Sequence, residues 1–181
     1  MQDYSYFLIG SFLIYTNYFI LGSILHKKIT NSIDYITLNE TTLISLILLS
    51  ILGFILNFFF SLNETLNFTI FILNLFLIFL VDKENIYKIL KKSFIFVLIL
   101  IIVISFSRNP EDSNLYHNSY IALINSDKIS FGISNLHFRF GHTAFIQYLS
   151  ALSYIPKISE HLIIIQNNFI YCLLLSIFFK F

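Results

Sequence analysis

Long apolar runs separated by short polar breaks make up most of the chain. A helix needs about 20 apolar residues to cross the hydrocarbon core of a membrane, with a tolerated range of about 17–25. The pattern therefore predicts an all-α fold, a polytopic transmembrane helix bundle of about six spans within a single membrane domain, residues 1–181. The predicted spans cover about 4–25, 41–60, 66–81, 93–107, 140–155 and 162–179, and an outer loop covers 108–139.

Two of these runs allow a second interpretation. The first run resembles a signal peptide in position, but its leader Met-Gln-Asp carries no basic residue and no small-residue cleavage site follows, which favours a retained span. The run 140–155 contains Gln147 and several small residues, and it is either a fifth span or a helix that enters the bilayer from the outer side. Gly53, within the second span, is expected to mark a close contact between helices.

The composition supports the membrane class and excludes others. The chain is 57% hydrophobic and 12% charged, with a mean hydropathy of +0.80. Soluble domains are typically about half apolar and about a quarter charged. A net charge of +1 provides no basic face for nucleic acid. The single cysteine, Cys172, lies in an apolar run and excludes a disulfide framework within the chain.

The distribution of lysines predicts the orientation in the membrane. Lys and Arg collect in cytoplasmic loops. Lysines follow the first span and fill the segment between the third and fourth spans, whereas the amino terminus and the turn between the second and third spans have none. The amino terminus and the 108–139 loop are therefore expected on the outer, extracytoplasmic side of the membrane. The lysines in question are Lys27, Lys28, Lys83, Lys88, Lys91 and Lys92.

The first half of the outer loop contains a helix-start signal and adjacent acids. The sequence Asn-Pro-Glu-Asp at 109–112 combines a favoured N-cap, a favoured first residue and acids near the positive end of the helix dipole, and it predicts a helix from Pro110 to about Asn125. Glu111 and Asp112 could serve this helix start alone. At the membrane interface, a carboxylate can also act as a general base or hold a divalent cation on a phosphate. Tyr116 and His117 follow within a turn and could form hydrogen bonds to the carboxylate or to a sugar.

The second half of the loop carries polar groups between aromatic residues. Arg139, flanked by two phenylalanines, is either an interfacial anchor or a bidentate phosphate ligand. Asn135, His137 and His142 would add donors to a phosphate, and Gly132 and Gly141 would permit tight approaches of the backbone there. The histidine spacings match no zinc pattern, so no metal site is predicted from histidines.

Two segments of the loop together resemble a known family. The segments are Glu-Asp-Ser-Asn-Leu-Tyr-His at 111–117 and Phe-Gly-Ile-Ser-Asn-Leu-His-Phe-Arg-Phe-Gly-His at 131–142. They resemble a poorly characterised group of bacterial multi-pass membrane proteins associated with surface polysaccharides. That group is similar to the GT-C-type glycosyltransferases, which take a sugar from a polyprenyl-phosphate donor. The resemblance covers about 35 residues and implies that this chain is similar to the amino-terminal part of a longer protein.

The resemblance implies a function and roles for the loop residues. It implies sugar transfer from a polyprenyl-phosphate donor in cell-surface glycan assembly, with Asp112 as the catalytic acid and Glu111 as its partner. His117 and Tyr116 would orient Asp112, and the phosphate would bind Asn135, His137, Arg139 and His142. Two alternatives stay open: a non-catalytic membrane subunit or transporter component, and an inactive truncated fragment. The cofactor is unknown, with a divalent cation as the candidate, and the expected partners are membrane lipid and the missing part of a longer protein.

Overall fold

The structure is a computed structural model that describes residues 4–30, 37–106, 117–129, 132, 135, 144–154 and 162–179. Within these ranges the chain is all-helical and contains no strand, which confirms the predicted all-α class. The described residues form seven α-helices and one 3-10 helix. They are α1 (Tyr4–Thr30), α2 (Leu38–Phe59), α3 (Glu64–Phe76), η1 (Leu77–Leu80), α4 (Lys83–Phe106), α5 (Asn118–Ser126), α6 (Phe145–Leu152) and α7 (Leu162–Phe179).

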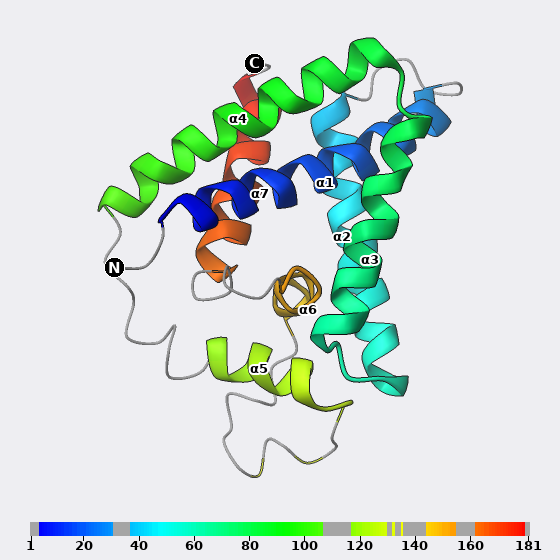
Figure 1. The fold of residues 1–181 in the computed structure, drawn as a ribbon, viewed down its shortest axis with the longest axis vertical. Helices are drawn as coiled ribbons and strands as arrows, with labels where there is room; N and C mark the ends of the chain where they lie inside the picture. The colour runs from blue at the N-terminus through cyan, green and yellow to red at the C-terminus, as the bar shows by residue number, and fades with distance from the viewer. Residues whose placement is uncertain are drawn as a thin grey trace.

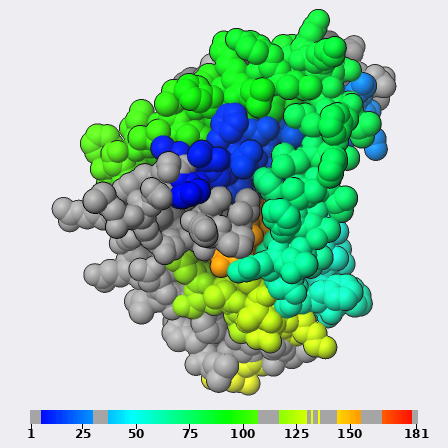
Figure 2. Space-filling model, viewed as in Figure 1, coloured from blue at the N-terminus to red at the C-terminus, as the bar shows by residue number. Residues whose placement is uncertain are grey.

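The longer helices form a bundle with α5 at one end. Helices α2 and α3 run in opposite directions on either side of a short turn, and α1 and α4 cross the molecule at an incline to them (Figure 1). Helix α1 packs on α2, α3 and α4, while α7 packs on α2, α4 and α6. On the face shown in Figure 2, α4 and α3 cover the upper and right parts with α1 visible between them, and α5 lies below. Helix α5 packs on α6.

An aromatic cluster joins α1, α4 and α7 in the core. The ring of Phe169 lies 4.6 Å from that of Tyr15 and 5.3 Å from those of Phe19 and Phe96, measured between centroids. All four side chains are at most 3% exposed. Tilted and edge-on ring pairs of this kind stabilise a fold by about 0.5–1.5 kcal/mol each beyond the area that they bury. The cluster therefore holds the two ends of the sequence together.

Polar side chains cap the N-termini of α2 and α3. Thr37 and Glu40 form a capping box: the Glu40 N–H donates to Thr37 Oγ1 at 3.3 Å and the Thr37 N–H donates to Glu40 Oε2 at 2.6 Å. The side chain of Asn63 accepts from the Leu66 N–H at 3.0 Å and begins α3. These caps satisfy N–H groups that have no partner within a helix.

Several of the predicted spans are confirmed as helices. Helix α2 and helix α7 coincide closely with the predictions 41–60 and 162–179, and α3 with η1 covers all but the last residue of the predicted 66–81. Helix α1 contains the predicted 4–25 and extends to Thr30. By length and composition, the helices Tyr6–Ile29, Leu38–Phe59 and Lys83–Phe106 are long and apolar enough to cross a membrane.

Two boundaries differ from the predictions. The fourth helix begins at Lys83, ten residues before the predicted start, so the lysine-rich segment predicted as a loop is helical. Hydropathy marked that segment as a break, but Lys, Glu and Leu are strong helix formers, and Ile89 faces the core at 1% exposure. The backbone carbonyl of Asp82 accepts the N–H groups of Asn85 and Ile86 at 2.9 and 3.1 Å and starts the helix.

The stretch 140–155 is the second difference. Helix α6 has eight residues, about 12 Å in length, and extended backbone at Ala144 precedes it. It is too short to cross a hydrocarbon core of about 30 Å. A full fifth span is therefore not formed by the described residues, and the alternative, a helix that enters the bilayer from the outer side, stays a prediction. Glu64–Leu80 and Ile165–Phe178 are also shorter apolar helices, so the structure does not show six spans.

Two glycines mark close helix contacts. A Cβ at Gly53 would lie 2.8 Å from Leu152 Cδ1, which confirms the predicted contact and identifies α6 as the partner. Gly22 was not predicted to matter. A Cβ there would lie 2.0 Å from Thr42 Oγ1 and 2.7 Å from Thr42 Cα, so α1 and α2 approach each other at this residue through backbone.

Candidate functional site

Helix α5 places the start of the predicted site against the end of the bundle. Its inward face carries Tyr120, Ile121 and Ile124, which are at most 7% exposed, while Ser119 and Ala122 face outward. The helix is therefore amphipathic, as the sequence predicts for the second half of the Pro110–Asn125 segment. The first half of that segment, with Asn109 and Pro110, lies outside the described residues.

One buried asparagine on α2 holds the α5 segment in place. The Asn57 side chain is 2% exposed, and its Nδ2 lies 3.2 Å from the Phe60 carbonyl, 3.3 Å from that of Ile124 and 3.0 Å from that of Asp127. Its backbone carbonyl accepts the Ile129 N–H at 2.9 Å. Asn57 thus connects the end of α2 to the end of α5. Below we call Asn57 and its three carbonyl partners the α2–α5 clamp.

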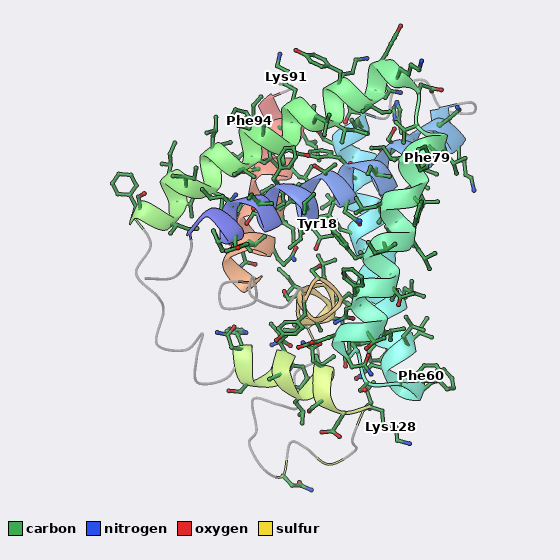
Figure 3. All side chains as sticks on the ribbon, in the orientation of Figure 1. Tyr18, Phe60, Phe79, Lys91, Phe94 and Lys128 are labelled. Carbon is green, nitrogen blue, oxygen red and sulfur yellow. The ribbon has the colours of Figure 1, made fainter. Side chains whose placement is uncertain are left out.

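A second backbone contact supports the clamp. The Leu62 N–H, in the turn between α2 and α3, donates to the Ile124 carbonyl at 3.1 Å, and the Leu62 side chain is fully buried. Figure 3 shows Phe60 and Lys128, which flank this region, at the same end of the molecule. Buried backbone carbonyls need hydrogen-bond donors, and at this end of the bundle the donors come from segments that are far apart in sequence.

His117 lies at the first turn of α5 and contacts α6. Its Nδ1 is 3.3 Å from Gln147 Nε2. An amide nitrogen only donates, so Nδ1 accepts, and the proton of a neutral ring then lies on Nε2. Gln147 is 2% exposed, and its Oε1 has no hydrogen-bond partner among the described residues. The pair fixes the imidazole through a side chain that is itself held inside the bundle.

Further polar side chains on α1, on α7 and just after α6 form hydrogen bonds in the interior. The Tyr18 hydroxyl contacts Ser153 Oγ and donates to Gln166 Oε1 at 2.8 Å, and Figure 3 shows Tyr18 at the centre of the molecule. Tyr15 donates to the Ile165 carbonyl at 3.0 Å and accepts from Asn168 Nδ2 at 3.3 Å. These bonds join α1, α6 and α7. A cavity of about 20 Å³ beside Tyr18 and Ser153 has room for one water molecule.

The structure describes two of the eight predicted site residues. His117 is half-buried against α6, and Asn135 is exposed, with its N–H donating to the Gly132 carbonyl at 2.9 Å. Gly132 has a φ of +85°, a backbone conformation that favours glycine. The predicted Glu111, Asp112, Tyr116, His137, Arg139 and His142 lie outside the described residues.

The described residues alone provide no metal site. Within the ranges that the structure covers, no three His, Cys, Asp or Glu side chains are grouped so that they could hold an ion. The acids predicted to hold a divalent cation, Glu111 and Asp112, lie outside those ranges.

Sequence reasoning did not assign a role to Asn57, Gln147, Tyr18 or Gln166. A signal was present for three of them, because each is an amide side chain within an otherwise apolar run. Such residues face the interior of a bundle and bond across helices. The sequence does not indicate which partner each one finds.

Comparison with known proteins identifies a family and no function. The model of the family described as "Domain of unknown function (DUF8201)" matches residues 5–181. No curated protein and no solved structure matches the chain.

Proposed function

We propose that this chain, which belongs to the DUF8201 family, is a bacterial membrane protein that transfers a sugar from a polyprenyl-phosphate donor during cell-surface glycan assembly. The observation that carries the proposal is the docking of α5. The α2–α5 clamp and Gln147 hold His117, and with it the end of the acidic segment 111–117, against one end of an apolar helix bundle. A carrier lipid would present its phosphate and sugar at such a position.

Placement in a membrane is supported by the two faces of α2. Its buried face is mostly small or polar, and its exposed face consists of large apolar residues. A soluble helix has the opposite arrangement, whereas membrane bundles place small and polar residues between helices. The buried residues are Asn39, Thr41, Thr42, Ser45, Leu46, Leu49, Ser50, Gly53 and Asn57; the exposed ones include Ile44, Ile47, Leu48, Ile51, Leu52, Ile55, Phe58 and Phe59.

The proposed orientation is supported by the two ends of α2. The helix has 22 residues, about 33 Å, which matches a hydrocarbon core of about 30 Å. Near its start, Lys92 Nζ on α4 donates to Asn39 Oδ1 at 2.7 Å, and near its end Asn57 holds α5. Lys91 and Lys128 accordingly lie at opposite ends in Figure 3. With lysine-rich α4 starting in the cytoplasm, α5 lies on the outer side.

The chemistry follows from the residue types of the outer segment. Asp112 would remove the proton of the acceptor hydroxyl or hold a divalent cation on the phosphate, with Glu111 beside it. His117, whose Nδ1 accepts from Gln147, would offer its Nε2 proton to the acid, and Tyr116 would add a second donor. Asn135, His137, Arg139 and His142 would bind the phosphate, since a guanidinium forms two parallel bonds to phosphate oxygens.

In the test, the Asp112→Asn variant is expressed in a strain from which the chromosomal gene has been deleted. We expect a fall in the rate of glycan assembly of about a hundredfold or more, because a general base typically contributes 10²–10⁴. The polyprenyl-linked sugar should accumulate in the membrane, since the step that consumes it is blocked. Surface glycan is measured by gel and lipid-linked sugar by mass spectrometry, with protein abundance measured in the membrane fraction.

The matched control is Asp127→Asn, which changes an exposed carboxylate at the other end of α5. It should leave glycan assembly unchanged. Normal assembly by an abundant Asp112→Asn variant would refute the proposed role of the acid.

A second candidate is a non-catalytic membrane subunit, which the exposed apolar surfaces of α2 and α4 favour because they offer large areas for other helices. Under this hypothesis, Asp112→Asn keeps normal assembly, whereas Leu or Ile to Lys changes on the exposed face of α4 abolish it. The exposed residues of α4 include Phe94, Ile95, Leu98, Ile101, Ile102 and Val103.

A further inference from the structure

A cavity lies at the end of the bundle opposite α5. It has a volume of about 490 Å³, within the range of about 300–1,000 Å³ that is typical of small-molecule sites. Its walls come from the end of α1, from η1 and from the start of α4; a short turn joins η1 to α4, and α1 packs on η1. The lining residues are Ser23, Ile24, His26, Lys27, Lys28, Leu80, Val81, Asp82 and Asn85.

The chemistry of this cavity is amphipathic. Ile24, Leu80 and Val81 supply apolar surface, while the two lysines and the imidazole supply donors. Leu80 is 62% exposed, so apolar surface continues from the cavity to the outside of the bundle. A ligand that fits has an anionic head and an apolar body.

The charges favour an anion. Lys27 and Lys28 contribute two positive charges and Asp82 one negative charge, and Lys27 Nζ lies 3.1 Å from Asp82 Oδ1. The Lys27 and Asp82 side chains are 61% and 60% exposed, so solvent screens this ion pair and a ligand can compete with it. Asp82 is the one acidic residue among those that line the cavity, so no second carboxylate of the lining is present to pair with Lys28.

From these observations we infer that the cavity binds the phosphate-containing headgroup of an anionic membrane lipid. Lys28 and Lys27 would contact the phosphate, and the acyl chains would continue over Leu80 onto the apolar surface. Basic pockets between helices on the cytoplasmic side are the usual sites for such headgroups. The site is separate from the proposed glycosyl-transfer site, because α2 lies between them with its start near one and its end at the other (Figure 1).

The experiment measures thermal unfolding of the purified full chain in a neutral detergent. A maleimide dye reports unfolding through Cys172, the one cysteine of the sequence, which is 3% exposed in the folded protein. Dioleoyl phosphatidylglycerol is compared with dioleoyl phosphatidylcholine and with inorganic phosphate. At saturation, phosphatidylglycerol should raise the midpoint by about 5 °C and phosphatidylcholine should not. An equal rise with inorganic phosphate alone would identify a free anion, not a lipid, and would overturn the lipid assignment.

The variant Lys27→Gln/Lys28→Gln should bind phosphatidylglycerol about 25-fold more weakly, since each lysine near an anionic lipid contributes about 1 kcal/mol. The matched control is Lys88→Gln/Lys91→Gln, which removes two exposed lysines of α4 that do not line the cavity, and it should retain the wild-type affinity. Asp82→Asn breaks the same ion pair as Lys27→Gln, but it should strengthen phosphatidylglycerol binding. Equal loss of affinity in the two double variants, or weaker binding by Asp82→Asn, would overturn the inference.

Discussion

The α2–α5 clamp makes a quantitative prediction, because a single side chain joins two segments of the fold. In Asn57→Leu, an apolar side chain of similar size replaces the amide. The amide nitrogen has two protons and three carbonyls within 3.3 Å, so it makes about two full hydrogen bonds at a time. The Ile124 carbonyl keeps a partner, since it also accepts from the Leu62 N–H.

The magnitude follows from the two carbonyls that lose the amide. Phe60 and Asp127 each lose a hydrogen bond worth about 1 kcal/mol, and each keeps some access to water because the bonds are only partly buried. We therefore expect a loss of about 2 kcal/mol in the free energy of unfolding. For a chain of this length, that corresponds to a fall in the midpoint of about 4–8 °C.

Two measurements test this prediction. Thermal unfolding is followed through the reactivity of Cys172, and hydrogen exchange is followed in the amides of α5. Exchange in α5 should accelerate more than exchange in α7, because the clamp holds only the former. The control Asn63→Leu removes the single bond of an exposed cap, Leu66 N–H to Asn63 Oδ1 at 3.0 Å, and should cost about 1 kcal/mol without affecting α5. A midpoint within 1 °C of the wild type, with α5 exchange unchanged, would refute the clamp.

The remaining predictions concern helix contacts and orientation. Gly22→Ala should destabilise the fold by more than about 3 kcal/mol, because the new Cβ would clash with the Thr42 backbone. Gly53→Ala should cost only about 1 kcal/mol, because the flexible Leu152 side chain can move away. Both costs are measured by thermal unfolding, and equal costs would contradict the packing argument. In a Cys172→Ser background, Asp127→Cys should react with a membrane-impermeant maleimide in intact cells, whereas Lys83→Cys should react only after lysis. The reverse pattern would contradict the proposed orientation.

The class of fold and most helix positions were predictable from the sequence. Apolar runs predicted α2 to within three residues at each end and α7 to the residue, because the length of an apolar run and its polar flanks are local properties. The same reasoning failed at the start of α4, where charged helix formers continue a helix that hydropathy alone ends. It also failed to separate a crossing helix from the eight residues of α6, because hydropathy does not show where extended backbone at Ala144 interrupts the run.

The site was predictable only as a list of residue types. The sequence indicated that His117 belongs to the polar segment and that Gly53 lies at a helix contact. It did not indicate that His117 forms a hydrogen bond with Gln147 or that Gly53 packs against Leu152. Those pairings depend on which faces of α2, α5 and α6 pack against each other, and this is decided only when the bundle assembles.

The sequence by itself determined that this chain is a set of apolar helices with lysines near the end of the first and near the start of the fourth, because residue types along the chain show both features. Only the tertiary structure decided that Asn57 joins α2 to α5, and that Lys27, Lys28 and Asp82 surround one cavity. The physical reason is that a buried polar group must find its partner in space, and residues far apart in sequence satisfy it only once the helices have packed.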